Sequence, residues 1–512
     1  MIREVKTENG IVRGLPAADP RITSFKGIPF AAPPVGENRW RAPQPCKDWE
    51  GVRECFQFGP ISVQDTPGLG TDIYCREWHV DPEIPMSEDN LYLNVWTGAK
   101  SADEKLPVVV WFFGGGFQFG YPAEMEFDGE RVARRGVVVV SVNYRLNVFG
   151  FMAHPELTKE QPDAPANFGF LDQQAGLKWV KRNIAGFGGD PDKVTIAGQS
   201  AGGGSVMAQV TNPANEGLFR GAIVQSALIS SAYDNIPFGS EPLESAEKNG
   251  EAFLKFMGVA SIDEARKIDA ETLLQKYNEF VPGLELTAGD GPHRMIPIYD
   301  GKFCFGDPVK LFMEGKHVNV RMMTGNTRDE FISGVQAKSK KEFEELVRAR
   351  LGEEAEEFLM FPESQVQTEM GFAPANGIEC TAKAVALRAQ ERGEGPVYYY
   401  RFETDIPGWD NPGTFHSVDL WFFFENLAKC WRPFVGRHYD LARQMCDYWC
   451  NFIKTGDPNG IGSDGEELPK WLPYTKQGRD GMSFTSQGAV AQHGETEFMR
   501  YLIDKKKESM TE

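Results

Sequence analysis

The sequence has no long hydrophobic run and little positive charge, and both absences limit what the protein can be. In its 512 residues, no stretch approaches the 18 or more apolar residues that a membrane-spanning helix needs. The 54 Lys and Arg residues are outnumbered by 73 Asp and Glu residues, which gives a formal charge of −19. Such a charge repels nucleic-acid phosphates and anionic lipid surfaces. We therefore expect no membrane span and no nucleic-acid partner.

Cysteine and histidine are few, and their spacing does not suggest a metal site. None of the 8 cysteines forms a C-x-x-C pair or joins a histidine at zinc spacing. Residues 1–8 lack the apolar core of a secretory signal peptide. The expected compartment is therefore the cytoplasm, where thiols stay reduced. We expect neither a metal nor a cofactor.

The order of strand and helix patterns predicts an α/β fold. Continuous apolar runs at 108–113 and 137–142 are typical of central strands that are covered on both faces. Apolar residues within 170–184 recur near helical spacing, a glycine-rich stretch follows, and 194–197 has a strand pattern. Strand, helix and strand in this order predict right-handed crossovers and a large, mostly parallel central sheet flanked by helices.

The second half of the sequence changes character. After about residue 230 the pattern becomes helical, and charged stretches there are typical of solvated helix faces. No repeat or long linker divides the chain. We therefore expect a single domain over 1–512, with helical insertions at approximately 231–320 and 335–410.

A G-x-S-x-G motif places a candidate nucleophile. Residues 198–202 read Gly-Gln-Ser-Ala-Gly, directly after the strand predicted at 194–197 and before a run of small residues that can open a helix. A serine on a sharp strand-to-helix turn projects its hydroxyl into a cleft, and the flanking glycines let neighbouring backbone approach. The motif thus predicts Ser200 as nucleophile. A simple Gly/Ser turn is the alternative interpretation.

A triple glycine supplies candidate anion-binding amides. Residues 114–116 are all glycine and follow the apolar run at 108–113. The N–H groups of Gly115 and Gly116, together with that of Ala201, would form a three-donor oxyanion hole, in which removal of one donor typically costs about 10²–10³ in rate. The alternative is a flexible loop.

The base and the acid should lie after the nucleophile. Where a G-x-S-x-G serine is the nucleophile, the chain order is serine, acid, histidine, which excludes His79 and His154. Of the remaining histidines, His416 is the candidate base, unless it is an ordinary loop histidine. For the acid, a predicted strand end offers Asp329 and Glu330 side by side. Adjacent side chains diverge, so only one can face the histidine, and spacing does not choose between them.

Taken together, these motifs resemble the type-B carboxylesterases of the α/β-hydrolase superfamily. The resemblance covers nearly the whole chain and includes five further segments: 25–36, 87–95, 143–145, 167–173 and 448–459. It implies an α/β-hydrolase fold, hydrolysis of carboxylic esters through an acyl-enzyme, and the roles of the following residues: Ser200 as nucleophile, Glu330 as acid, His416 as base, and Gly115, Gly116 and Ala201 as oxyanion donors. The resemblance, not the spacing, selects Glu330 over Asp329.

Three residues depart from the family pattern. Asn90 stands where many animal members have a disulfide-bonded cysteine, which favours a bacterial esterase. Gln199 replaces the glutamate of cholinesterases and removes a negative charge that would favour a cationic substrate. Phe331 stands where glycine is common and would narrow the pocket. Trp78 lies near the position of the choline-stacking tryptophan, but we expect it to have a structural or acyl-packing role.

The sequence therefore predicts a cytoplasmic serine esterase that acts on small apolar or aromatic acyl esters. The alternatives are an amidase or peptidase with the same triad, and a non-catalytic adhesion-type homologue. We expect a monomer or a small homo-oligomer whose partner is the small-molecule ester. Arg39 and Glu88 are predicted to form a structural ion pair, and Ser226 resembles a serine that supports the triad, or is a buried strand-end hydroxyl.

Overall fold

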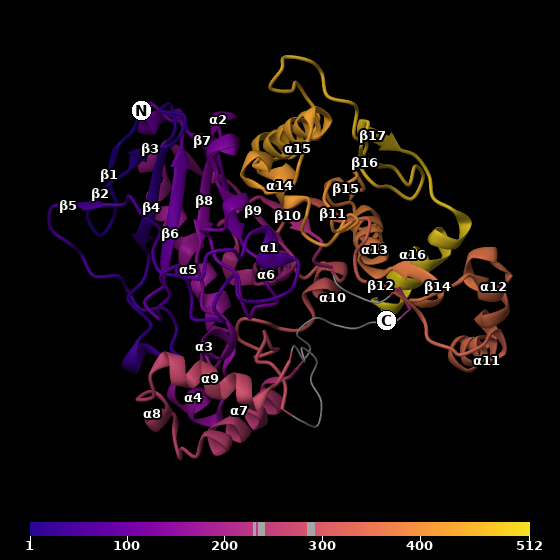
Figure 1. The fold of residues 1–512 in the computed structure, drawn as a ribbon, viewed down its shortest axis with the longest axis horizontal. Helices are drawn as coiled ribbons and strands as arrows, with labels where there is room; N and C mark the ends of the chain where they lie inside the picture. Colours follow the sequence, from indigo (N-terminus) through magenta and orange to yellow (C-terminus); the bar gives the residue numbers. More distant parts are fainter. Residues whose placement is uncertain (229–231, 234–240, 284–291, 512) are drawn as a thin grey trace.

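An 11-stranded sheet forms the centre of the fold in a computed structural model that describes residues 1–228, 232–233, 241–283 and 292–511 (Figure 1). The strand order is β17-β16-β15-β11-β10-β9-β7-β8-β6-β4-β3. Neighbours are parallel from β16 through β8 and antiparallel at both ends. The strands are β3 (Leu15–Pro16), β4 (Thr23–Pro29), β6 (Tyr92–Thr97), β7 (Leu106–Phe112), β8 (Val138–Val142), β9 (Gly189–Gln199), β10 (Gly221–Gln225), β11 (Arg321–Thr327), β15 (Val397–Phe402), β16 (Gly481–Thr485) and β17 (Gly488–Gln492). The expected mostly parallel sheet is confirmed.

Both faces of this sheet are buried, which explains the continuous apolar runs. Side chains alternate along a strand, so Val108 and Val110 of β7 join one core while Val109 and Trp111 join the other. The first core includes side chains of α5 (Phe168–Asn183), α6 (Ala201–Val210), α10 (Pro308–Met313), α13 (Gly377–Glu391) and α16 (Glu497–Ser509). The second includes α2 (Glu130–Arg134), α3 (Asn147–Phe151), α7 (Leu243–Met257), α9 (Ala270–Phe280), α14 (Leu420–Phe423) and α15 (Gly436–Thr455).

The elements expected around Ser200 are present. The runs at 108–113 and 137–142 form β7 and β8, and the helical pattern at 170–184 forms α5. The strand expected at 194–197 is longer, because β9 begins at Gly189, where it already pairs with Leu106 of β7. The glycine-rich stretch thus ends the helix and also opens the next strand.

The two expected insertions differ in content. Within 231–320 lie α7, α8 (Ile262–Ala265), α9 and α10, while residues 231, 234–240 and 284–291 are outside the described part of the chain. The stretch 335–410 is only partly helical. Besides α11 (Lys340–Leu351), α12 (Ala355–Met360) and α13, it contains most of a small sheet and the central strand β15, which pairs with β11. The small sheet consists of β12 (Ile332–Val335), β13 (Gln367–Thr368) and β14 (Gly371–Asn376). In Figure 1, α7 to α9 and α11 with α12 extend from different sides of the central sheet.

The remaining helices and strands are short and lie outside the central sheet. A second small sheet contains β1 (Glu4–Lys6), β2 (Ile11–Arg13) and β5 (Val52–Glu54), and two short helices are α1 (Tyr74–Glu77) and α4 (Pro155–Glu160). The 3-10 helices are η1 (Gly36–Asn38), η2 (Ala102–Glu104), η3 (Met125–Phe127), η4 (Ile184–Phe187), η5 (Pro213–Asn215), η6 (Gly352–Glu354), η7 (Pro362–Gln365) and η8 (Leu427–Lys429). None of the helices in the described residues is long and apolar enough to cross a membrane.

An ion pair ties the N-terminal loops to the helical region after α7. The Arg39 guanidinium donates to both carboxylate oxygens of Glu88, at 2.7 and 2.6 Å, and also to the carbonyls of Ala265 and Ile268. Arg39 is 4% exposed. The expected structural pair is therefore present, and it is bidentate.

Candidate active site

Ser200 occupies a strained turn between β9 and α6. Its backbone angles are φ 55° and ψ −127°, and its N–H donates to the Gln225 carbonyl of β10 at 2.9 Å. A left-handed conformation of a residue other than glycine costs about 1–3 kcal/mol and persists only where the surrounding structure enforces it. The turn thus fixes the position of the serine at the carboxyl end of the central strands.

Two glycines of the motif make this turn possible by close packing. A methyl group built on Gly202 would lie 2.0 Å from the carbonyl oxygen of Phe112 at the end of β7. A methyl group on Gly198 would lie 2.3 Å from the carbonyl oxygen of Gly202. Real carbon–oxygen contacts are never this short, so only glycine fits at either position. The first turn of α6 is thereby held against the end of β7, directly after Ser200.

The triple-glycine loop lies next to the serine. A methyl group on Gly114 would lie 3.2 Å from Cβ of Ser200, whereas one on Gly116 would meet nothing within 4 Å. Gly115 and Gly116 have φ of 109° and 61°. Among the residues that the structure describes, their N–H groups have no backbone acceptor. Ala201 opens α6, where the first N–H groups of a helix lack intrahelical partners. All three amides are thus free to bind a ligand oxygen near Ser200.

Glu330 and His416 are in direct contact. Nδ1 of His416 lies 2.6 Å from Oε2 of Glu330, and Oε1 of the same carboxylate accepts the N–H of Thr327 at 3.0 Å. Glu330 comes three residues after β11, and His416 lies in the loop before α14. Since an ionised carboxylate can only accept, Nδ1 of the neutral imidazole carries the proton and Nε2 is an acceptor.

Burial and mutual attraction oppose each other in this pair. Burial raises the pKa of the Glu330 carboxyl. The charge and hydrogen bond of His416 lower this pKa by a larger amount, so the net pKa lies below the ordinary value. Burial lowers the pKa of His416, whereas Glu330 and then Asp419 raise it, and the net pKa lies above 6.5. The site therefore stabilises an imidazolium beside an ionised carboxylate.

The neighbouring carboxylate faces elsewhere. Asp329 pairs with Arg328 at 2.7 Å and accepts the N–H of Thr414 at 2.6 Å. A single bridge between Asp329 and Phe415 aligns the two loops so that Glu330 reaches the histidine. Of the two adjacent carboxylates, Glu330 is therefore the one that contacts His416.

Gln199 contacts His416, which the sequence did not reveal. Its side-chain amide lies 3.1 Å from Nε2 of His416, and the residue is 2% exposed. The hydroxyl of Ser200 makes no hydrogen bond to any described residue. Nε2 of His416, the atom that would accept the serine proton, therefore accepts a hydrogen bond from the Gln199 amide instead.

The aromatic side chains around His416 differ in their exposure to solvent. The Phe331 ring lies 4.9 Å from the imidazole and is 57% exposed, so it borders the open side of the site. Trp78 is 4% exposed and stacks on Phe415 at 6.4 Å, with Trp421 at 6.1 Å. Trp78 therefore packs behind the loop of the base, in agreement with a structural role.

A second polar layer lies behind the pair. Asp419 is fully buried, three residues after the histidine, and accepts the Tyr400 hydroxyl at 2.7 Å. Burial raises the pKa of Asp419 to about 6, although the Tyr400 hydrogen bond acts in the opposite direction. Ser226 is also buried, with φ 48°. No sequence pattern marks Asp419, apart from its spacing from His416.

Metal ligands are not gathered at this site or elsewhere in the described residues. No group of three or more His, Cys, Asp and Glu side chains among them is placed to hold an ion. The polar groups found here are instead a serine hydroxyl, an imidazole, a carboxylate and free amides, which together suit acyl transfer.

Comparisons with known proteins agree on one family. A sequence model described as the carboxylesterase family matches residues 2–370 and 375–502. The chain is 32% identical to a fumonisin B1 esterase of Sphingopyxis macrogoltabida over 94% of this chain and 86% of that protein. It is 31% identical to a para-nitrobenzyl esterase of Bacillus subtilis over 98% and 99% of the two chains.

Solved structures give the same result. A structure titled PNB esterase superimposes with a TM-score of 0.77 at 30% identity, covering 98% of this chain and 99% of that one. A carboxylesterase of Geobacillus stearothermophilus superimposes with a TM-score of 0.74 at 31% identity, over 98% and 100% of the two chains.

Proposed function

Because the chain belongs to the carboxylesterase family, has the α/β-hydrolase fold and hydrolyses carboxylic esters, we propose roles for its residues in that reaction. Ser200 is the nucleophile, His416 the general base and acid, and Glu330 the carboxylate that orients the imidazole. Gly115, Gly116 and Ala201 form the oxyanion hole. The contact of 2.6 Å between His416 and Glu330, on the same end of the sheet as the strained Ser200, is the observation that supports this assignment.

The reaction begins with attack of the Ser200 hydroxyl on the ester carbonyl. The serine proton passes to Nε2 of His416, and the imidazolium is stabilised by Glu330 at Nδ1. The carbonyl oxygen, now negative, accepts hydrogen bonds from the three amide N–H groups. The intermediate collapses, the alcohol leaves with the proton from Nε2, and the acyl group stays on the serine. Water then repeats these steps and releases the carboxylic acid.

Gln199 adds one step to this sequence. Nε2 must release the Gln199 amide before it accepts the serine proton, because its single lone pair serves one donor at a time. Catalytic hydrogen bonds are often absent without substrate and form in the substrate complex. The imidazole therefore exchanges the amide for the serine hydroxyl when an ester enters.

The substrate class is a small ester with an apolar or aromatic acyl group. Phe331, exposed beside the base, offers an aromatic face to such a group. Gln199 is neutral, so the site lacks a negative side chain at that position for a cationic alcohol. The relatives are named for different compounds, fumonisin B1 and para-nitrobenzyl esters, so the substrate preference of this chain depends on its own residues.

The domain organisation, the compartment and the oligomeric state complete the proposal. We propose that residues 1–512 form one domain, because both hydrophobic cores lie on the same sheet. A bacterial, cytoplasmic enzyme is supported by two bacterial relatives and by cysteines that are all free, which suits a reducing compartment. It acts as a monomer or a small homo-oligomer.

The test is a panel of p-nitrophenyl acyl esters and hydroxycinnamate methyl esters, measured as kcat and kcat/KM on wild type and on Ser200→Ala. Loss of the nucleophile should lower kcat by about 10⁶-fold. Ser101→Ala, on the exposed loop before β7, is the matched control and should keep full activity. Matched amides should turn over far more slowly than the esters. No turnover of any ester by wild type, or an active Ser200→Ala, would contradict the proposal.

A further inference from the structure

A cavity lies away from Ser200, Glu330 and His416. Its volume is about 350 Å³, at the low end of the range of roughly 300–1,000 Å³ that is typical of small-ligand pockets. It is lined by Leu15, Pro16, Ala17, Ala18, Ser24, Lys26, Phe56, Trp96, Asp128, Glu130, Arg131, Glu425, Asn426, Ala428 and Lys429. Most of these residues come from β3, β4, β6, the start of α2 and the segment that includes η8, and the others from adjoining loops.

Strand direction places this cavity at the opposite end of the sheet. Trp96 of β6 pairs with Val139 near the start of β8, whereas Leu93 pairs with Val142 at its end. Since β8 runs parallel to β7 and β9, its carboxyl end lies on the side of Ser200. Trp96 therefore lies toward the amino ends of the parallel strands, and the cavity is separate from the active site.

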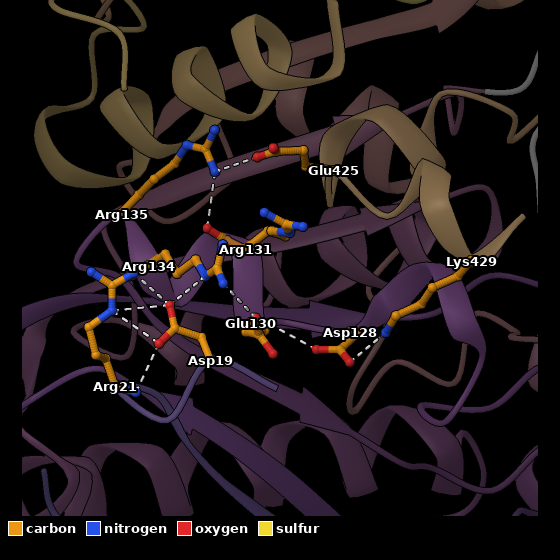
Figure 2. Close-up of polar contacts among 9 residues, drawn as sticks. All are labelled: Asp19, Arg21, Asp128, Glu130, Arg131, Arg134, Arg135, Glu425 and Lys429. Atoms are coloured by element: carbon orange, nitrogen blue, oxygen red, sulfur yellow. Dashed lines mark hydrogen bonds and ion pairs between the residues drawn. The ribbon is translucent and has the colours of Figure 1, made fainter. Parts of the chain in front are cut away.

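Every carboxylate that lines the cavity already has a cation. Asp128 pairs with Lys429 at 2.5 Å, Glu130 with Arg134 at 3.3 Å, and Glu425 with Arg135 at 2.7 Å (Figure 2). Arg134 is further held by Asp19. The acidic side chains around the cavity are thus neutralised, two of them by arginines that do not line it.

Two cations in the same cavity have no such partner. Neither Lys26 nor Arg131 forms an ion pair with any residue that the structure describes. In Figure 2 no dashed line joins the Arg131 guanidinium to the other residues drawn, although its backbone carbonyl accepts a hydrogen bond from Arg135. The Lys26 ammonium lies 4.5 Å from the centre of the Phe58 ring. In a chain of charge −19, two uncompensated cations that share one cavity are unexpected.

We propose that this cavity is a binding site for a small organic dianion, a phosphate monoester or a dicarboxylate, held by Arg131 and Lys26. The planar guanidinium of arginine binds carboxylate or phosphate through two parallel hydrogen bonds, and lysine adds a point charge. The apolar side chains of Trp96, Phe56 and Leu15 suit the carbon skeleton of such a ligand.

A bound anion would also relieve an electrostatic cost. Burial lowers the pKa of Lys26, nearby Asp128 raises it, and Lys429 lowers it again, for a net pKa below the ordinary value. The protein thus carries a partly buried ammonium that the surrounding charges do not fully support. A ligand oxyanion would supply the missing counter-charge, so its binding favours the charged form of this lysine.

The experiment is isothermal calorimetry at constant ionic strength with glycerol phosphate, succinate and inorganic phosphate as probes and glycerol as the uncharged control. Wild type should bind one equivalent of a dianion saturably. Affinity should fall at least about tenfold in Arg131→Gln and in Lys26→Met. Arg131→Lys keeps the charge without the planar fork and should lose less. Lys341→Gln, whose side chain is 87% exposed on α11, removes one positive charge elsewhere and should bind like wild type.

The outcomes separate clearly. Binding of glycerol phosphate but not succinate, or the reverse, identifies the ligand class and supports the site. No saturable binding of any probe overturns the proposal, as does equal affinity in wild type and in both charge-removing variants. An equal loss in Lys341→Gln would indicate general electrostatics and would also overturn it. Thermal unfolding and ester hydrolysis, which do not involve this cavity, verify that each variant is folded.

Discussion

Replacement of Gln199 by glutamate tests the contact between this residue and the base. In wild type the neutral amide donates to Nε2 of His416 and therefore favours the uncharged imidazole. The Gln199→Glu substitution would place a carboxylate at the same position, about 3 Å from Nε2, and reverse the preference. The imidazolium would then be held by two carboxylates, because Glu330 already binds Nδ1.

The size of the effect follows from distance and burial. Two unit charges about 4 Å apart attract by about 4 kcal/mol at an effective dielectric constant near 20. Since about 1.36 kcal/mol corresponds to one pKa unit, the upper limit is about three units. Gln199 is 2% exposed, so desolvation of the new carboxylate will reduce the shift. We expect the pKa of His416 to rise by about one to three units.

The assay is the pH dependence of kcat/KM on a p-nitrophenyl ester. Activity requires neutral His416, so it falls as the pH drops through the pKa of this residue. The acidic limb should therefore move to higher pH in Gln199→Glu, while the activity well above that limb recovers. Gln487→Glu, in the exposed turn between β16 and β17, adds the same charge elsewhere and should leave the limb in place. An unchanged limb in Gln199→Glu would refute the contact in the working enzyme.

Four further substitutions test other parts of the structure. Glu330→Gln should lower kcat by roughly 10⁴-fold because the imidazole loses its orienting carboxylate. Asp329→Asn should change kcat only a few-fold and instead lower the melting temperature. The reverse ranking of the two variants in steady-state kinetics would exclude Glu330 as the catalytic acid. Arg39→Met should lower the free energy of unfolding by about 3–5 kcal/mol, measured in urea, because it leaves Glu88 unpaired. Phe331→Ala should raise KM for aromatic acyl esters more than for acetate esters, and equal changes for both would contradict a role in acyl packing.

The central fold could be predicted because its signals are local. Strands β7 and β8 are covered on both faces, so their sequences are apolar at nearly every position, Ser141 of β8 being polar, and α5 between strands shows helical spacing. The small sheet of β12 to β14 carries no comparable signal. All four residues of β12 are only half-buried, and its pairing with β14 shifts in register, so neither alternation nor an apolar run marks it.

The candidate site, too, could be predicted only where its signal is local in the sequence. Ser200 can be recognised from Gly198 and Gly202, because the close packing of the turn admits only glycine at these two positions. The choice between Asp329 and Glu330 needed the family resemblance, because it depends on a bridge to Phe415 that is distant in sequence. The Gln199 contact with His416 was missed for a similar reason. It joins residues 217 positions apart, and no local pattern of either segment encodes it.

The packing around Gly198 and Gly202 separates two selective pressures that the motif combines. Any side chain at either position would collide with backbone of α6 or β7, whether or not the protein hydrolyses anything. Purifying selection for stability alone would thus retain both glycines in a descendant that had abandoned catalysis. The hydroxyl of Ser200 has no such protection, since it makes no hydrogen bond that holds the described structure together. Within this motif, retention of the glycines indicates an intact fold, whereas only retention of the serine would indicate the activity that we propose.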